Sequence, residues 1–78
     1  MTIAQAVAKR VNDLLIIHNK KQYGLAKEML VSHNTMTNIV NAKMKSVNLN
    51  TLFLMCRAFG ITIGEFFSDP IFIQVDVD

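Results

Sequence analysis

Apolar side chains recur every three or four positions along the first eighteen residues of the chain. This period is typical of a helix that buries one of its faces. Thr2 and Gln5 have the spacing of a capping box, in which two side chains bond the unpaired backbone N–H groups at a helix start. Asn19 follows the pattern, and asparagine tolerates the left-handed conformation in which many helices end. The sequence therefore predicts a first helix that runs to about His18.

The helical period continues in shorter segments, each bounded by residues that favour helix ends. A second helix is predicted from Gln22 over about nine residues. Ser32 and Asn48 are suitable N-cap residues for a third and a fourth helix, because their side chains accept bonds from unpaired backbone N–H groups. Gly60 stands where a glycine often ends a helix. Thr62 then begins a second capping box and a fifth, short helix.

The pattern changes at Pro70, because a proline disfavours the helical conformation in the residue before it. The fifth helix is therefore expected over residues 63–68. In the tail, residues 71–78, apolar and polar side chains alternate with a period of two, which is typical of a β-strand. The apolar face of this predicted strand would consist of Ile71, Ile73, Val75 and Val77.

Composition limits the class of protein. The sequence has 78 residues, of which 51% are hydrophobic and 18% charged. A chain of this size forms one domain, and its apolar content is too high for intrinsic disorder. The single cysteine excludes a disulfide scaffold and a zinc site made of thiolates. Because no segment has the ~18 apolar residues of a membrane span and no signal-peptide core is present, we expect a cytoplasmic protein without a membrane partner.

Charge is unevenly distributed, although the formal net charge is only +2. Residues 1–60 contain all eight Lys and Arg residues and two acidic ones, whereas residues 61–78 contain four acidic residues and no basic one. A basic segment of this size suits a polyanion such as DNA. A solvated basic surface would have the same composition, so the spacing of side chains has to distinguish the two.

A short helix, a turn and a polar-faced third helix occur in a fixed order, with characteristic residues at their junctions. Around the turn and in the third helix these residues are Gln22, Leu25-Ala26, Val31-Ser32, Met36, Ile39 and Asn41. Downstream they are Leu49-Asn50-Thr51-Leu52 and Ala58-Phe59-Gly60-Ile61-Thr62-Ile63. This ordered set resembles the lambda-repressor-like, Cro/CI-type (XRE) family of helix-turn-helix domains over about residues 5–67. The resemblance implies an all-α domain of five helices that binds DNA.

Five positions depart from the usual pattern of this family. Leu30 stands in the turn where the family usually has glycine, and a leucine forced to positive φ would cost ~1–2 kcal/mol, so we expect an altered turn. Ala42 replaces another common glycine. Leu15 and Val40 together replace an Arg–Glu pair, an exchange that is often neutral or stabilising. Lys20 replaces an apolar residue and has no evident compensation in the sequence.

The resemblance implies that the third helix lies in the major groove of DNA, with its N-terminal residues at the base edges. His33, Asn34 and Asn38 match the positions that most often read bases in the family, and the short polar residues Thr35 and Thr37 lie beside them. An asparagine can pair with N6 and N7 of adenine through two hydrogen bonds. Without the family register, the same residues would equally describe an ordinary solvated helix face.

Further polar residues on both sides of the third helix match phosphate-contacting positions of the family. They are Gln22, Asn41, Lys43 and Lys45. Lysines that neutralise phosphates make DNA affinity fall with salt. Lys21 is another candidate, although its segment equally suits a solvated loop. His33 is not expected to bind a metal because no Cys or carboxylate completes a set, and Cys56 is predicted to be a buried core residue.

These features predict a sequence-specific DNA-binding transcriptional regulator, a repressor that acts as a homodimer, with no cofactor and no enzymatic activity. Residues 1–68 would form the DNA-binding domain, and residues 69–78 an extension. A strand without a sheet in its own domain invites pairing with another chain, which makes the extension a candidate for dimerisation unless it folds back on the domain. The alternative function is a helix-turn-helix antitoxin or adaptor that binds a partner protein, such as a toxin, through this extension.

Overall fold

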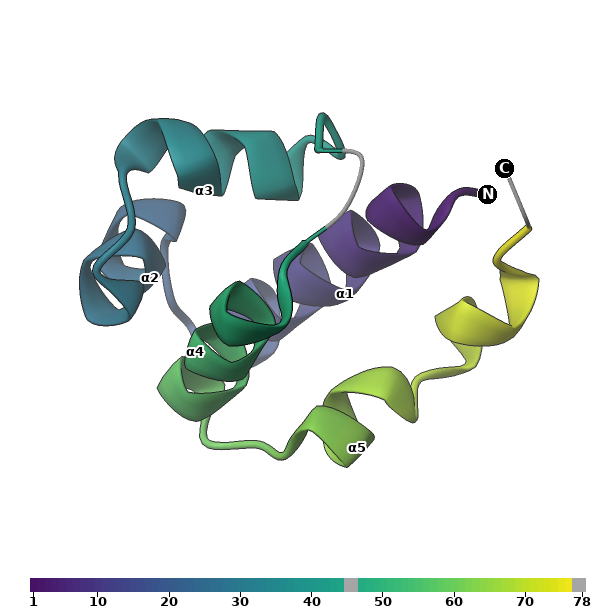
Figure 1. Ribbon diagram of the computed structural model, residues 1–78. Helices are drawn as coiled ribbons and strands as arrows, with labels where there is room; N and C mark the ends of the chain where they lie inside the picture. Colours follow the sequence, from purple (N-terminus) through teal and green to yellow (C-terminus); the bar gives the residue numbers. More distant parts are fainter. Residues whose placement is uncertain (45–46, 77–78) are drawn as a thin grey trace.

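The computed structural model describes residues 1–44 and 47–76, and these residues form five α-helices followed by a short 3₁₀ helix (Figure 1). The predicted all-α fold of five helices is confirmed. α3 lies along one side of the molecule and α5 along the other (Figure 1). The elements are α1 (Ile3–Ile17), α2 (Gln22–Met29), α3 (His33–Val40), α4 (Leu49–Phe59), α5 (Ile63–Phe67) and the 3₁₀ helix η1 (Pro70–Gln74).

The core is apolar and is formed by the inward faces of all five α-helices. Val11 of α1 is completely buried, and α1 packs against both α3 and η1. Leu25, Met36, Met55 and Phe66 from the other four helices are equally enclosed. Burial of a side chain of this size typically contributes ~1.5–3 kcal/mol relative to exposure. The periodic apolar positions therefore attach α3 to the body of the domain by one face and leave its other face outward.

The predicted helix ends are confirmed. Thr2 and Thr62 each form a complete capping box with the residue three positions later. The side chains of Ser32 and Asn48 each accept a hydrogen bond from the backbone N–H three positions later, at 3.0 and 2.8 Å. Gly60 ends α4 with a φ of 70°. Because each such N-cap is worth ~1 kcal/mol, the caps fix where the short helices begin.

The turn between α2 and α3 keeps a left-handed geometry despite its leucine. Leu30 has φ 58° and ψ 38°, a region that favours glycine. The N–H of Val31 donates to the carbonyl oxygen of Ala26 at 3.1 Å, which closes α2 as a glycine cap would. The expectation of an altered turn is therefore wrong. The backbone of the turn has the left-handed conformation that a glycine would have, and Leu30 adopts it at a cost in conformational energy. Ala42 and Asn19 are also left-handed, with φ of 56° and 52°.

Two apolar side chains fill the place of the family's Arg–Glu pair. Leu15 of α1 and Val40 of α3 both belong to the core cluster. Cys56 of α4 is buried in the same cluster, as predicted. Burial raises the pKa of the Cys56 thiol, which keeps it protonated and inert.

The prediction of a β-strand in the tail is wrong. The chain forms η1 there, with Pro70 at its start. The Oδ1 atom of Asp69 accepts a hydrogen bond from the backbone N–H of Ile71 at 2.9 Å, which caps a helical turn. Within residues 1–44 and 47–76 there is no second strand with which an extended tail could pair. Since a lone strand leaves its backbone groups unpaired, the local cap decides the conformation.

The tail is held against the domain by an aromatic contact and by bonds to the first residue. Phe72 packs on the core, with its ring centroid 5.8 Å from that of Phe66 and 4.8 Å from that of Phe67. The N–H of Asp76 donates to the carbonyl oxygen of Met1 at 2.8 Å, and the α-amino group of Met1 donates to the Asp76 carboxylate at 2.9 Å. The tail therefore folds back on the domain, which is the alternative that the sequence left open.

The described residues among the four predicted to form a dimerisation surface differ in their exposure. Ile71 and Val75 are half-buried, whereas Ile73 is 87% exposed. Val77 lies outside the described residues. Of the described three, Ile73 alone offers most of its side chain to another molecule.

Candidate nucleic-acid interface

α3 presents polar side chains to solvent because its opposite face is buried. Its buried residues are Met36, Ile39 and Val40. Asn34, Asn38 and Asn41 are spaced by four and three positions, so they follow one another along the outward side of the helix. We call these three residues the asparagine stripe. Asn34 and Asn41 are exposed and Asn38 is half-buried. An amide side chain has both donors and an acceptor, but the Nδ2 of Asn41 already donates to the carbonyl oxygen of Thr37 at 2.9 Å.

The remaining predicted base-reading residues differ in what their side chains already contact. His33 is exposed at the start of α3. The hydroxyl of Thr37 donates to the carbonyl oxygen of His33 at 2.9 Å, and the hydroxyl oxygen of Thr35 accepts from the Oγ of Ser32 at 2.9 Å. Both threonines are half-buried. The structure therefore brings His33 and the asparagine stripe to the outside, and gives the two threonines partners within α3 and its cap.

The end of α3 is fixed to α1 by a residue that the sequence analysis missed. The Nδ2 of Asn12 donates to the carbonyl oxygens of Ala8 at 2.9 Å and Val40 at 3.1 Å. This bond satisfies one of the last carbonyl groups of α3, which has no partner within the helix. The signal in the sequence was a lone amide beside the apolar stripe of α1. Asn12 thus orients the asparagine stripe without being part of it.

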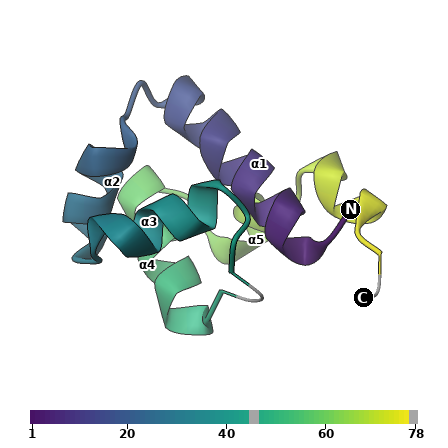
Figure 2. The same cartoon turned by 90° about the horizontal axis from the view of Figure 1, so that it is seen from above.

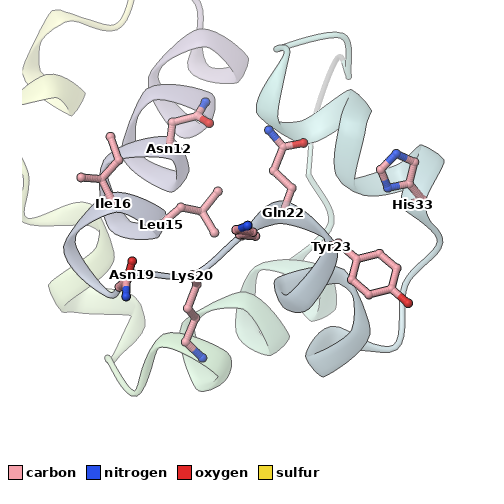
Figure 3. A pocket seen from close by; sticks show the side chains of 9 residues that line it. Asn12, Leu15, Ile16, Asn19, Lys20, Gln22, Tyr23 and His33 are labelled. Atoms are coloured by element: carbon pink, nitrogen blue, oxygen red, sulfur yellow. The ribbon is translucent and has the colours of Figure 1, made fainter.

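An open groove of about 700 Å³ connects the first residues of α2 and α3 with the end of α1 (Figure 3). It brings together three of the predicted DNA contacts, Lys21, Gln22 and His33, although they lie up to twelve positions apart in the sequence. The groove is lined by Asn12, Leu15, Ile16, Asn19, Lys20, Lys21, Gln22, Tyr23 and His33. No acidic residue is among them, which suits an anionic ligand.

A comparison with models of protein families matches residues 10–70 to the Cro/C1-type helix-turn-helix DNA-binding domain. The chain belongs to this family. This Cro/C1-type protein is accordingly a DNA-binding regulator, and α2 and α3 form its helix-turn-helix unit. No curated protein and no solved structure gives a match to the chain.

Lys20 of this Cro/C1-type domain has the compensation that its sequence did not reveal. Its Nζ donates to both carboxylate oxygens of Glu28 at 2.8 Å and to the carbonyl oxygen of Ala58 at 3.0 Å. The ammonium group therefore joins the segment before α2 to the last turn of α4. The sequence did not reveal these partners because they lie eight and thirty-eight positions away from Lys20.

Arg10 is likewise used inside the Cro/C1-type domain. Its Nε donates to the carbonyl oxygen of Phe66 and its Nη2 to that of Glu65, both at 2.9 Å, and its Nη1 lies 3.5 Å from the Asp69 carboxylate. These bonds hold the end of α5 against α1. The bond to Phe66 satisfies a carbonyl group at the helix end, whereas the oxygen of Glu65 also accepts from the backbone N–H and the hydroxyl of Ser68. Because the guanidinium group of Arg10 is bonded within the domain, the number of basic residues in the sequence overestimates the positive charge available to DNA.

Four exposed cations make no ion pair with another described residue, and two of them lie at the two ends of the helix-turn-helix unit; the four are Lys21, Lys27, Lys43 and Arg57. Lys9 is paired with Asp13 at 3.0 Å on α1. Lys21 precedes α2 and Lys43 follows α3; both are exposed, and neither makes an ion pair with another described residue. Lys45 lies outside the described residues. The positions of Lys21 and Lys43 leave the asparagine stripe between two basic groups.

The part of the Cro/C1-type domain that the structure describes contains no group of three His, Cys, Asp or Glu side chains placed to hold a metal ion. In the same residues no helix has both the length and the apolar character needed to cross a membrane.

Proposed function

We propose that the protein is a sequence-specific transcriptional regulator that reads the major groove of DNA with α3. The observation that carries this proposal is the asparagine stripe, which faces outward on a helix whose other face is fixed in the core. A rigid helix with short amides on one side has the size and chemistry that the major groove accepts. Lys21 and Lys43 stand at both ends of the unit, where the phosphate backbone borders the groove.

The residues have distinct roles in this proposal. Asn34 and Asn38 each pair with adenine through two hydrogen bonds, a contact worth ~1–3 kcal/mol of discrimination. His33 reads a neighbouring base edge. Thr35 and Thr37 make weaker contacts to DNA, because their hydroxyl groups are already hydrogen-bonded to Ser32 and to the carbonyl oxygen of His33. The residues that bind phosphates and set the register are Lys21, Gln22, Asn41, Lys43 and Lys45.

The experiment is selection of bound duplexes from a random pool, followed by titration of the selected site and a scrambled duplex. Asn34→Ala and Asn38→Ala should each reduce the preference for the selected site by about 5- to 150-fold. Gln74→Ala is the matched control, because it removes an exposed amide from the tail and should change nothing. Equal affinity for selected and scrambled duplexes would contradict the proposal.

We further propose that the protein acts as a homodimer and represses transcription. Helix-turn-helix dimers bind two half-sites about one helical turn apart, so the selected site should be a palindrome or close to one. Sedimentation with and without the selected duplex tests the dimer, and Ile73→Glu tests whether the exposed tail residue contributes to it. A template whose promoter overlaps the site should give less transcript with protein than without it. More transcript would identify an activator instead.

The antitoxin or adaptor alternative rested on the expectation of an unpaired strand in the tail. The described part of that tail is a 3₁₀ helix packed on the domain. The alternative has therefore lost the observation that motivated it, and we do not favour it.

A further inference from the structure

Tyr23 is a large aromatic side chain that the core does not use. It is the second residue of α2 and is 67% exposed. Figure 3 shows Gln22, Tyr23 and His33 along one side of the open groove, with Asn12 and the end of α1 along the other. The phenol oxygen has no hydrogen-bond partner among the described residues. The ring and its hydroxyl are therefore available to a ligand in the groove.

A cation stands against the same ring. The Nζ of Lys27 lies 5.6 Å from the centroid of the Tyr23 ring, one helical turn further along α2. Lys27 is exposed and makes no ion pair with another described residue. A cation placed over an aromatic face is attracted by the ring and restrains it. The pair therefore offers an anion a phenol donor and a positive charge from one face of α2.

The position of Tyr23 in the groove indicates which class of ligand the pair would contact. Tyr23 shares the groove with Lys21, Gln22 and His33, so the pair continues the surface that we propose for DNA. The groove lining contains no carboxylate, and the ammonium group of Lys20 is already bonded to Glu28. Tyrosine is one of the side chains that donate to phosphate oxygens of DNA. An amphipathic ring beside a basic turn suits the deoxyribose and phosphate of the backbone, since both an apolar and a charged surface are present there.

We propose that Tyr23, restrained by Lys27, is a further contact to the DNA backbone, at a phosphate beside the bases read by α3. The phenol donates a hydrogen bond to a phosphate oxygen, and the ring packs on the adjacent sugar. Lys27 places its charge near the same phosphate. The inference rests on the proposed function, because it assumes that DNA lies across α3 and the start of α2.

The test compares Tyr23→Phe with the unaltered protein by titrating the selected duplex and a scrambled duplex at several salt concentrations. Loss of one hydrogen bond to an anionic phosphate should weaken binding about 10- to 150-fold on both duplexes, because a backbone contact carries no sequence information. The dependence of affinity on salt should stay the same, since a phenol releases no counterion. Lys27→Gln should instead make the negative slope of log affinity against log salt shallower by ~0.9.

Two controls keep the test decisive. Phe53→Leu alters a half-exposed aromatic residue of α4 outside this groove and should leave binding unchanged. Thermal unfolding of Tyr23→Phe should match the unaltered protein, because the ring and its contact with Lys27 are retained. Unchanged affinity in both Tyr23→Phe and Tyr23→Leu would overturn the inference. So would a loss confined to the selected duplex, which would indicate a base contact.

The failure of this inference can be told apart from the failure of the proposed function. If Asn38→Ala loses discrimination while Tyr23→Phe and Tyr23→Leu both bind normally, the backbone contact is wrong and the reading by α3 stands. If no duplex is preferred but Tyr23→Phe still binds weakly to all of them, sequence-specific reading is wrong and the backbone contact stands.

Discussion

Leu30 has a strained backbone conformation, and its side chain makes few packing contacts. It has a left-handed backbone and 91% of its side chain is exposed, so little packing offsets the cost of its conformation. A β-carbon in this region costs ~1–2 kcal/mol, and a glycine would remove that cost while losing ~0.4–1 kcal/mol through its more flexible unfolded state. Leu30→Gly should therefore raise the free energy of unfolding by about 1 kcal/mol, measured by denaturant titration.

Leu49 provides the matched control for this change. It is 71% exposed, but it lies in the right-handed conformation of the first turn of α4. Leu49→Gly should lower the free energy of unfolding by ~0.5–1 kcal/mol, because glycine costs helix stability there. A loss of stability in both variants would show that Leu30 makes a contribution that its exposure does not reveal.

Lys20 should matter more for stability than an ordinary surface lysine. Lys20→Met removes the bonds to Glu28 and to the carbonyl oxygen of Ala58, and we expect it to lower the free energy of unfolding by about 1 kcal/mol. Lys9→Met removes a pair with Asp13 on the same exposed helix face and should cost less than ~0.5 kcal/mol. Equal effects in chemical denaturation would mean that the bond to α4 contributes nothing.

At the scale of the elements, α5 depends on a cap that contains a titratable group. The backbone N–H of Thr62 donates to the carboxylate of Glu65 at 3.0 Å, and this bond, with the side chain of Thr62, holds the pKa of Glu65 below its ordinary value. A lowered pKa means that the ionised group stabilises the fold above its unfolded pKa, ~4.3. This contribution is lost as pH falls through the lower, folded pKa.

The variant Glu65→Gln isolates that contribution, because a glutamine completes the equivalent capping box at Thr2. The unaltered protein should be the more stable of the two at pH 7, and the difference in thermal midpoint should shrink as the pH is lowered below about 4.3. A difference that is constant between pH 7 and pH 3 would contradict the role of the ionised carboxylate.

The contribution of the tail to stability should come mainly from Phe72 and not from the alternating apolar residues around it. Phe72→Ala removes the ring that packs against α5 and should lower the free energy of unfolding by ~1–3 kcal/mol, less than for a fully enclosed phenylalanine because Phe72 is half-buried. Ile73→Ala, at the exposed neighbouring position, should change it by less than ~0.5 kcal/mol. The opposite order in denaturant titrations would support a role of Ile73 within the folded domain.

At the scale of the whole molecule, elements whose apolar period agrees with their caps were predictable, and the tail, where the period and the cap disagree, was not. The five helices follow from apolar periods and caps within a few residues of each other, as at Ser32 and Asn48. The tail has an equally regular pattern, but the cap by Asp69 and the packing of Phe72 outweigh it. A period of two predicts a strand only where a partner strand exists.

In the candidate site, features of a single helix were predictable and features that depend on packing between helices were not. The asparagine stripe could be read from the spacing along α3, because one helix carries all of it. The bond from Asn12 to Val40 and the groove that joins Lys21 to His33 depend on how α1 packs against its neighbours. The number of basic residues also misled, since Arg10 and Lys20 bond to carbonyl groups at the ends of α5 and α4.

This use of charge has a measurable consequence for DNA binding. Lys43→Gln should make the negative slope of log affinity against log salt shallower by ~0.9, because the variant would lose the phosphate contact of an exposed lysine beyond α3. Lys9→Gln removes the same formal charge from the α1 pair with Asp13 and should leave the slope unchanged. Equal reductions would mean that DNA responds to the overall charge and not to the place of each lysine.

The bonds between Met1 and Asp76 determine where any attached group would stand. Both residues lie at one corner of the molecule, away from α3 in both orientations (Figures 1 and 2). A fluorophore carried by the side chain of either residue would therefore extend from the same corner and keep the bond to the α-amino group only if that group stays free. A label at this corner leaves the asparagine stripe open to the solution.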